Sequence, residues 1–387
     1  MYIIQGLRTP IGKSHKGGFR FMRPDDLAVE VIKRLLQTLP ELPPSLIEDV
    51  IVGNAVPEAE QGMQIGRMVS LMALGVQVPG MTVNRYCASG LEAMAIAAHR
   101  IEAKQADCLI AGGVESMSLV PMMGVKTALN YAIATKHPTY YSSMGLTAEE
   151  VAKQFGISRE EQDVFALTSH QKAAKAWQEN KYQKEVIPVL VQEVYAEDGA
   201  KKQREFWVEK DEGIRADASL EVMSKLKPAF ALQGSVTAGN SSQTSDGAAF
   251  AVLMSERLMK SLNLTPKARL VSYAVVGVEP RIMGIGPALA IPKALKSADK
   301  KSADIDLTEL NEAFASQCLA VMKELSLNPE TVNVNGGAIA IGHPLGASGA
   351  RLGLHLINEL QRRKKKYGMA AACVGGGQGV AAVFEVF

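Results

Sequence analysis

The sequence has almost no excess of charge of either sign. Its 387 residues include 42 Lys and Arg against 40 Asp and Glu, a formal net charge of +2 at pH 7. Without a surplus of cations to neutralise phosphate groups, the composition argues against a nucleic-acid partner. Hydrophobic residues make up 47% and charged residues only 21%, which also excludes a disordered chain. A chain of this length is expected to divide into two or three domains.

Cysteine is scarce and shows no spacing typical of a bridge or a metal site. Four cysteines, at positions 87, 108, 318 and 373, are too few for a disulfide framework in so long a chain. The sequence has no C-x-x-C or H-x-x-x-H pattern, the spacings that zinc ligands favour. We therefore expect free thiols, a cytoplasmic location and no bound metal.

Long hydrophobic runs are also missing. The N-terminus has a four-residue apolar start followed by basic residues, the reverse of a secretory signal, so we expect none. The nearest candidate for a membrane span, residues 367–384, carries no charge but contains five glycines. It favours two short buried strands joined by a glycine-rich turn over a helix that spans a membrane.

What the chain does have is one plan that occurs twice. Residues 49–58, 81–90, 91–104 and 107–117 are predicted to form strand, loop, helix and glycine-containing strand, and 305–316, 331–350, 350–366 and 369–386 repeat this order. Asn54 matches Asn311, Val-Asn at 83–84 matches 334–335, and the glycines at 112–113 match those at 375–377. The pattern predicts a duplicated α/β unit whose parallel sheets carry helices on both faces.

Two segments depart from the repeat in composition. Helix 91–104 is apolar almost all round, so we expect it to be buried between two sheets. Residues 119 to about 235 are more polar, and 147–177 have helical periodicity with Thr147 and Glu150 in capping-box spacing. This region is predicted to be a mainly helical insertion or lid.

Two residues next to predicted helix starts could carry chemistry. Cys87 lies in NRYCASG, where helix-end N–H groups would lower the pKa of its thiol and favour a nucleophile; the alternative is a small core residue. His343 lies in NGGAIAIGHPLGASGAR, between Gly342 and Pro344, where the glycine-rich backbone would let a ligand approach closely. A histidine base beside a cysteine is the pairing expected of an activated thiol.

Two further residues end predicted strands. Cys373 lies in AACVGGGQG, whose consecutive glycines free N–H groups to bind an oxyanion. Asn311 in LNEAFAS could orient a water or donate to an oxyanion. Residues 6–14, GLRTPIGKS, have five residues between their glycines where a phosphate-binding P-loop has four, so we reject that motif. GGGQG likewise lacks the spacing of a dinucleotide-binding loop.

Together these segments resemble the thiolase family nearly end to end. RTPIG, NRYCASG, GGVESMS, MGLTAE, GSVTAGNSSQTSDGAA, NEAFA, NGGAIAIGHPLGASGAR and CVGGGQG occur in the family's order. The resemblance is strongest to the members that cleave 3-ketoacyl-CoA in bacterial fatty-acid β-oxidation. It implies an α/β fold with layers α-β-α-β-α, built from two duplicated halves with an inserted loop domain. The implied domains are 1–118 plus about 245–265, a CoA-binding loop domain at 119–244, and 266–387.

The resemblance also implies a role for each site residue. Cys87 would be the nucleophile that holds the acyl group, His343 would take its proton, and Cys373 would be the second acid/base. Asn311 would hold a water in one oxyanion hole, and the backbone N–H groups of Cys87 and Gly375 would form the other. Positions that match Arg215 and Ser242 contact the adenine and pantetheine portions of CoA in the family.

The implied partners are small molecules and other copies of the chain. The substrates would be 3-ketoacyl-CoA and CoA, with CoA a co-substrate and no cofactor tightly bound. The family commonly forms homodimers or homotetramers, and a multifunctional β-oxidation enzyme is a further candidate partner.

Three alternatives remain open at the level of sequence. A biosynthetic thiolase that condenses two acetyl-CoA would carry the same catalytic residues, although Ser143 stands where many such relatives have a histidine. A decarboxylating ketoacyl synthase generally uses Cys-His-His, against which Cys373 argues. A non-catalytic thiolase-like lipid-binding protein would need no reactive thiol.

Overall fold

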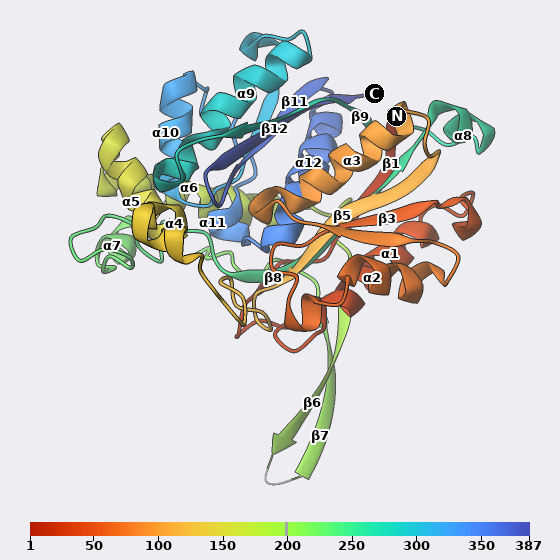
Figure 1. Ribbon diagram of the computed structural model, residues 1–387, viewed down its shortest axis with the longest axis horizontal. Coiled ribbons are helices and arrows are strands. Elements are labelled where there is room, and N and C mark those ends of the chain that lie inside the picture. The colour runs from red at the N-terminus through yellow and green to blue at the C-terminus, as the bar shows by residue number, and fades with distance from the viewer. Residues whose placement is uncertain (198–199) are drawn as a thin grey trace.

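Ten strands form one hydrogen-bonded sheet system that runs through the whole molecule. The computed structural model describes residues 1–197 and 200–387. The strand order is β10-β11-β12-β9-β1-β8-β5-β3-β4, and the short β2 pairs with β8 (Figure 1). The two halves of the chain meet where Ile3 of β1 pairs with Ala268 of β9. The sheet is therefore continuous although its halves come from separate parts of the sequence.

Each half contributes its own set of strands and helices. The N-terminal half holds β1 (Tyr2–Arg8), β2 (Gly12–Lys13), α1 (Pro24–Gln37), η1 (Pro44–Leu46), β3 (Asp49–Gly53), η2 (Ala59–Gln61), α2 (Ile65–Leu74), β4 (Gly80–Val83), η3 (Tyr86–Ala88), α3 (Ser89–Glu102), β5 (Cys108–Ser116), β8 (Ser245–Met254) and α8 (Glu256–Ser261). The C-terminal half holds β9 (Ala268–Gly277), η5 (Pro280–Ile285), α9 (Gly286–Ser297), η6 (Ser302–Asp304), β10 (Leu307–Leu310), α10 (Ala315–Leu325), α11 (Ala338–Ile341), α12 (Leu345–Arg363), β11 (Tyr367–Val374) and β12 (Gln378–Val386).

The halves repeat one strand order, as the sequence predicted. Along one half the order is β4-β3-β5-β8-β1, and along the other β10-β11-β12-β9, with Val332 bridging β10 where β4 would lie. Only β3, β4 and β5, and β10 and β11, run parallel, whereas β8, β1, β9 and β12 pair antiparallel. The expectation of parallel sheets was therefore wrong for the strands next to the junction. There β12 follows β11 as an antiparallel hairpin, which needs no crossover helix.

The strand register defines which residues of the two halves are equivalent. Asn54 and Asn311 each follow the parallel strand that pairs with β5 or β11, as expected. Gly53 pairs with Gly113, and Leu310 pairs with Ala371, so Gly113 is the counterpart of Ala371. The expected match between glycines 112–113 and 375–377 is wrong, because the first pair lies inside β5 and the second set forms the turn after β11.

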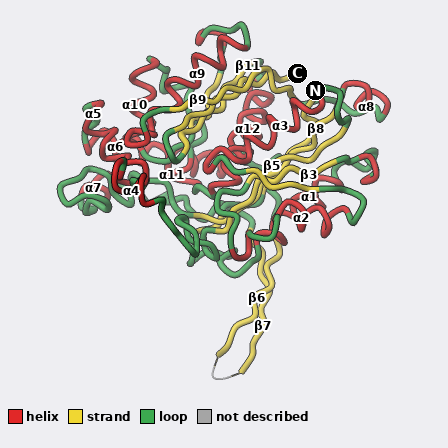
Figure 2. The backbone as a smooth tube through the Cα atoms, in the orientation of Figure 1, coloured by secondary structure: helices red, strands yellow, loops and turns green. Residues whose placement is uncertain are grey.

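Helices and sheet form five layers (Figure 2). Helices α1 and α2 cover the outer face of the N-terminal strands, and α9 and α10 cover the outer side of the C-terminal strands. Between the two halves lie α3 and α12, which pack on each other and on strands of both halves. The central core is built largely from alanines and leucines of these two helices and from inward-facing strand residues. The predicted burial of helix 91–104 is confirmed in α3.

The two central helices cross at very short range. A Cβ atom on Gly90 of α3 would lie 2.8 Å from the carbonyl oxygen of Gly346. A Cβ atom on Gly349 of α12 would lie 2.5 Å from the backbone nitrogen of Leu91. Such separations are below van der Waals contact, so only glycine permits this approach. The crossing brings the N-terminal ends of both helices together.

The segment between β5 and β8 is inserted into the N-terminal half. It contains α4 (Tyr131–Lys136), η4 (Pro138–Tyr141), α5 (Met144–Phe155), α6 (Arg159–Gln178), β6 (Val189–Glu197), β7 (Ala200–Val208) and α7 (Leu220–Ser224). The antiparallel β6–β7 hairpin, which the sequence did not predict, projects from the body of the molecule (Figure 1). We propose 119–244 as a separate loop domain, flanked by halves at 1–118 plus 245–265 and 266–387.

The helices of this segment start at different residues from those expected. Thr147 lies inside α5 and does not cap it, so the predicted Thr147–Glu150 capping box is wrong. The capping box is formed instead by Ser158 and Glu161 at the start of α6. Within residues 1–197 and 200–387, no helix combines the length and apolarity needed to cross a membrane.

Candidate active site

Cys87 stands on a strained turn between β4 and α3. The preceding Tyr86 has a φ of +42°, in the left-handed region that a large side chain rarely adopts. Two contacts hold this turn: the Tyr86 N–H donates to Asn84 Oδ1 at 2.8 Å, and Ser89 Oγ donates to the Tyr86 carbonyl at 2.7 Å. Strain of this kind persists only where the surroundings impose it. The turn places the Cys87 thiol immediately ahead of a buried helix.

His343 occupies the equivalent position ahead of α12. Gly342 has a φ of +115°, which turns the chain into the loop that carries the histidine. The His343 backbone N–H donates to the Gln243 carbonyl and to Ser245 Oγ, both at 3.1 Å. Its ring is held at both nitrogens, with Nδ1 2.6 Å from Ser348 Oγ and Nε2 3.3 Å from Asn311 Nδ2.

Asn311, Cys373 and Gly375 come from the ends of β10 and β11. The Asn311 N–H donates to the Ala371 carbonyl at 2.8 Å, and its side-chain Oδ1 is buried without a hydrogen-bond partner. Cys373 is fully buried near the end of β11 and lies near Cys87, which adds to the effect of burial in raising the Cys373 pKa. The backbone N–H groups of Gly375 and of Cys87 itself both contact the Cys87 sulfur.

The structure therefore gathers five of the seven residues singled out in the sequence. Cys87 comes from the N-terminal half, and His343, Asn311, Cys373 and Gly375 come from the C-terminal half. Parallel strands end at one edge of each sheet, and the α3–α12 crossing brings those two edges face to face. The duplicated architecture is thus the physical reason why residues so far apart in sequence share one site.

Burial sets the charge state of the site. Removal from water raises the pKa of the Cys87 thiol to about 12, although the N–H groups at its sulfur act in the opposite direction. Burial lowers the pKa of His343 to about 3, with a smaller contribution from the Arg351 cation. Burial also raises the pKa of Cys373 well above its usual range. The resting pair is thus a neutral thiol and a neutral imidazole, and the expected lowering of the Cys87 pKa is wrong because desolvation outweighs the helix end.

Apolar side chains surround the Cys373 thiol and form a wall of the site. Cys373 packs in one buried cluster with Ala148 of α5, Val236, Met283 and the Ala313–Phe314 pair, and Met144 packs against this cluster. Phe230 meets the Phe314 ring edge to face, with centroids 6.0 Å apart. The inserted segment and the C-terminal half thus line the site jointly with groups suited to an acyl chain.

The two residues expected to contact CoA lie on the inserted segment. Ser242 is half-buried, and its backbone N–H donates to the Ala313 carbonyl at 2.9 Å, which places it beside the apolar wall. Arg215 is exposed, and its backbone N–H donates to His170 Nδ1 at 3.2 Å. Within residues 1–197 and 200–387, no salt bridge involves the Arg215 guanidinium.

Sequence reasoning missed a buried carboxylate beside the site. Glu115 lies two residues beyond Gly113, as Cys373 lies two beyond Ala371, so it is the counterpart of Cys373. It accepts the N–H groups of Ala55 and Gly346, both at 2.8 Å, and thereby joins the end of β3 to the start of α12. The strand pairing reveals this equivalence. The sequence did not, because matching glycines 112–113 with 375–377 put the two halves out of register.

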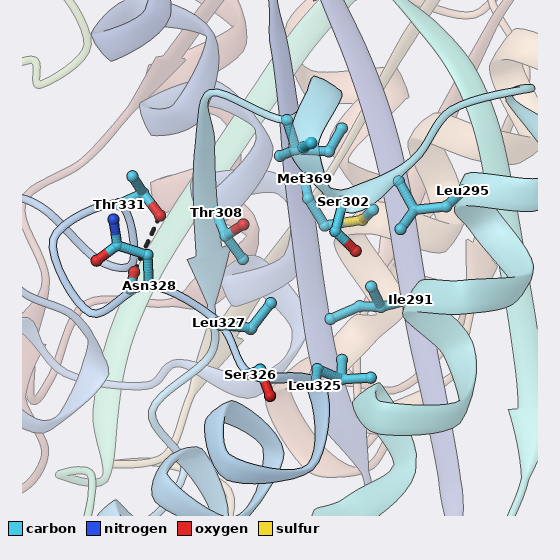
Figure 3. A pocket seen from close by; sticks show the side chains of 12 residues that line it. Ile291, Leu295, Ser302, Thr308, Leu325, Ser326, Leu327, Asn328, Thr331 and Met369 are labelled. Carbon is cyan, nitrogen blue, oxygen red and sulfur yellow. Dashed lines mark hydrogen bonds between the residues drawn. The ribbon is translucent and has the colours of Figure 1, made fainter.

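A hollow elsewhere in the fold does not coincide with these residues. It has a volume of about 330 Å³ and lies between α9, β10 and the end of α10, lined by apolar side chains such as Ile291, Leu327 and Met369 (Figure 3). None of the residues predicted for catalysis or CoA binding lines it. In the described part of the chain, no group of three or more His, Cys, Asp or Glu is arranged to hold a metal ion.

Known proteins share this architecture and its sequence. The family model for the thiolase N-terminal domain matches residues 1–257, and the thiolase C-terminal model matches residues 264–386. A 3-ketoacyl-CoA thiolase from Bacillus subtilis is 51% identical over 387 residues, which cover 99% of this chain and 98% of the relative. The human peroxisomal 3-ketoacyl-CoA thiolase is 45% identical, with 99% of this chain and 90% of that protein covered.

A solved structure agrees with the sequence relatives. The crystal structure of the Bacillus anthracis acetyl-CoA acetyltransferase superposes with a TM-score of 0.91 at 40% identity, covering 100% of this chain and 98% of the other. Family models thus span nearly the whole chain, and both its sequence and its fold are similar to those of the matched proteins. The chain belongs to the thiolase family.

Proposed function

We propose that this enzyme cleaves 3-ketoacyl-CoA with CoA, giving acetyl-CoA and an acyl-CoA shortened by two carbons. The observation that carries the proposal is that Cys87 lies close to Cys373 and packs with Leu345, two residues beyond His343, in a buried and largely apolar site. The relatives at 51% and 45% identity that bear the name 3-ketoacyl-CoA thiolase support the degradative activity.

The first half-reaction forms an acyl-enzyme. The Cys87 sulfur attacks the 3-keto carbon while its proton passes to Nε2 of His343. The tetrahedral oxyanion then collapses, the C2–C3 bond breaks, and Cys373 donates its proton to C2 of the departing acetyl-CoA. The acyl group remains on Cys87 as a thioester, and a Cys373 thiolate and a His343 imidazolium are left. The ions form only while bonds are made and broken, which is consistent with a resting enzyme in which the Cys87 thiol and the His343 imidazole are neutral.

The second half-reaction returns the enzyme to its starting state. The Cys373 thiolate takes the proton of the CoA thiol, and the CoA sulfur attacks the acyl carbonyl. The backbone N–H groups of Cys87 and Gly375 stabilise this oxyanion, whereas Asn311, through a water, and His343 stabilise the enolate oxygen of acetyl-CoA. The Cys87 sulfur then leaves and recovers its proton from His343. Preorganised donors of this kind are each worth about 3 kcal/mol of transition-state stabilisation.

The same proposal extends to CoA binding and to the cellular setting. Ser242 contacts the pantetheine arm and Arg215 the adenine portion, with CoA as co-substrate and no tightly bound cofactor. The enzyme works in the cytoplasm as a homodimer or homotetramer, and a multifunctional β-oxidation enzyme is its candidate partner.

A thiolysis assay across acyl-chain lengths tests the substrate class. Ser143, which precedes Met144 at the apolar wall, is small and exposed and takes up less space than the histidine that many short-chain relatives carry at this position. We expect cleavage of acetoacetyl-CoA and of longer 3-ketoacyl-CoA thioesters. Activity confined to acetoacetyl-CoA would favour the biosynthetic role instead.

Acyl trapping tests the covalent step. Mixing the enzyme with 3-ketoacyl-CoA in the absence of free CoA should leave one acyl group on the peptide that contains Cys87, read by mass spectrometry. Cys87→Ser should fold, carry no acyl group and lose activity by about 10⁴-fold or more. The matched variant Cys108→Ser changes a buried cysteine of β5 outside the site and should retain activity. An acyl group found on Cys373 would contradict the assignment of the nucleophile.

A further inference from the structure

Ser348 makes two contacts that its single hydroxyl proton cannot serve at once. The residue is fully buried in the first turns of α12. Its Oγ lies 2.8 Å from the Pro344 carbonyl oxygen and 2.6 Å from Nδ1 of His343. A hydroxyl has one proton to donate and two lone pairs to accept with. If that proton goes to the carbonyl, the Nδ1 atom must carry a proton of its own.

The opposite side of the imidazole ring decides between the two arrangements. The Nε2 atom of His343 faces the Nδ2 amide of Asn311 at 3.3 Å. An amide nitrogen only donates, so Nε2 must accept and therefore carries no proton. Were the serine proton directed at Nδ1, the Nε2 atom would carry a hydrogen pointing at the amide hydrogens of Asn311. Both sides of the ring agree only when the proton is on Nδ1.

We infer that Ser348 is a positioning residue that fixes His343 in the tautomer protonated at Nδ1. This inference rests on the proposed role of His343 as the base for Cys87. A neutral imidazole takes up a proton only at its unprotonated nitrogen, and in this tautomer that nitrogen is Nε2, on the side of Asn311. The other tautomer would present a hydrogen to the Cys87 thiol and could not accept its proton.

The burial of His343 makes the choice of tautomer matter. Because burial lowers its pKa to about 3, the ring is neutral at physiological pH and exists in one tautomer or the other. The structure describes no carboxylate in contact with the ring, which would otherwise orient it. Ser348 thus does with a hydroxyl what an aspartate does in many histidine-based sites.

Removal of the hydroxyl tests the inference. Ser348→Ala keeps the volume and the helix, so the variant should fold. We expect kcat/KM for thiolysis to fall about 10- to 100-fold. This is more than the loss of one net hydrogen bond would cause and less than a histidine held entirely in the wrong tautomer would cause. The matched control Ser272→Ala removes another buried hydroxyl, which donates to the Ala294 carbonyl, and should change neither rate nor tautomer.

A spectroscopic readout separates tautomer control from mere structure. In enzyme labelled with ¹⁵N-histidine, the signals of His343 are assigned by their loss in His343→Asn. The wild type should show a protonated Nδ1 and a bare Nε2, and Ser348→Ala should shift the population toward protonated Nε2. A protonated Nε2 in the wild type, or a tautomer that Ser348→Ala leaves unchanged, would overturn the inference. A wild type with protonated Nδ1 but no thiolysis would refute the proposed function and leave this assignment standing.

Discussion

The two halves of the molecule offer the same positions to the site and use them differently. Cys87 and His343 each stand two residues ahead of a buried helix, Asn54 corresponds to Asn311, and Glu115 corresponds to Cys373. In the N-terminal half, Asn54 and Glu115 both hold the backbone in place. Asn54 donates to the Val114 carbonyl at 2.9 Å, and the Glu115 carboxylate accepts backbone N–H groups from both halves.

The corresponding side chains of the C-terminal half lie at the site instead of holding the backbone together. Oδ1 lacks a partner in both asparagines, but the Asn311 amide nitrogen contacts the His343 ring at 3.3 Å where that of Asn54 binds a carbonyl. The Cys373 thiol lies among apolar side chains. The comparison teaches that duplication supplies two converging sets of strand ends. One set was used to hold the scaffold, and the other was left available for chemistry.

Changing the matched pair Cys373 and Glu115 should give the largest contrast. Cys373→Ala removes the second acid/base, so kcat should fall about 10²- to 10⁴-fold with a small change in stability. Glu115→Ala leaves the N–H groups of Ala55 and Gly346 buried without an acceptor and should lower the free energy of unfolding by about 3 kcal/mol. Assays of thiolysis and of urea unfolding on both variants check this. A Cys373→Ala enzyme with full activity would break the comparison.

Changing Asn311 and Asn54 should likewise affect activity in one case and stability in the other, with smaller effects. Asn311→Ala should reduce kcat by about 10²-fold, because an oxyanion would lose its oriented water. Asn54→Ala should cost about 1–2 kcal/mol of unfolding free energy, because the Val114 carbonyl would lose a buried donor. The same two assays apply. If Asn54→Ala lowered kcat as much as Asn311→Ala does, the roles of the two halves would not be distinct.

The pH dependence of stability should reveal whether His343 is buried and neutral in the folded enzyme. Burial lowers the pKa of His343 from 6.5 to about 3, so the unfolded chain binds a proton below about 6.5 that the folded enzyme does not. This contribution to stability is present above the unfolded pKa and is lost as the pH falls. The slope for one such proton is about 1.4 kcal/mol per pH unit.

Comparison with His343→Asn isolates this contribution from that of the carboxylates. Between pH 6.5 and 5, the wild type should lose about 1–2 kcal/mol more unfolding free energy than the variant. Denaturant unfolding at several pH values measures both curves. Parallel curves would mean that His343 is hydrated in the folded enzyme and would contradict its neutral state.

The sequence predicted most of the fold because its apolar pattern and strand ends repeat. The burial of α3 followed from its alanine-rich faces, and the two strands at 367–384 followed from a glycine-rich turn. The antiparallel pairing of β8, β1 and β9 was missed, because apolar periodicity carries no information about strand direction. The capping box was misplaced from Ser158 to Thr147, since both sites have a hydroxyl residue three positions ahead of a glutamate.

For the site, the sequence identified residues with special chemistry but not their supports. Cys87, His343, Cys373 and Asn311 were recognisable from residue type, flanking glycines and family motifs. Ser348 and Glu115 were not, because a serine in a helix and a glutamate in a strand gain meaning only from what they contact. The direction of the Cys87 pKa was wrong for the same reason: helix-end N–H groups are visible in the sequence, and desolvation is not.

The glycine crossing of α3 and α12 limits how such an enzyme can diversify during evolution. A contact between side chains can be readjusted by a new rotamer, whereas a contact between backbones leaves no torsion to adjust. A methyl group at Gly90 or Gly349 would force the helices apart and carry the nucleophile away from its base. New substrate preferences are therefore expected to arise in the inserted segment between β5 and β8, where sequence can change without altering the spacing of the catalytic groups.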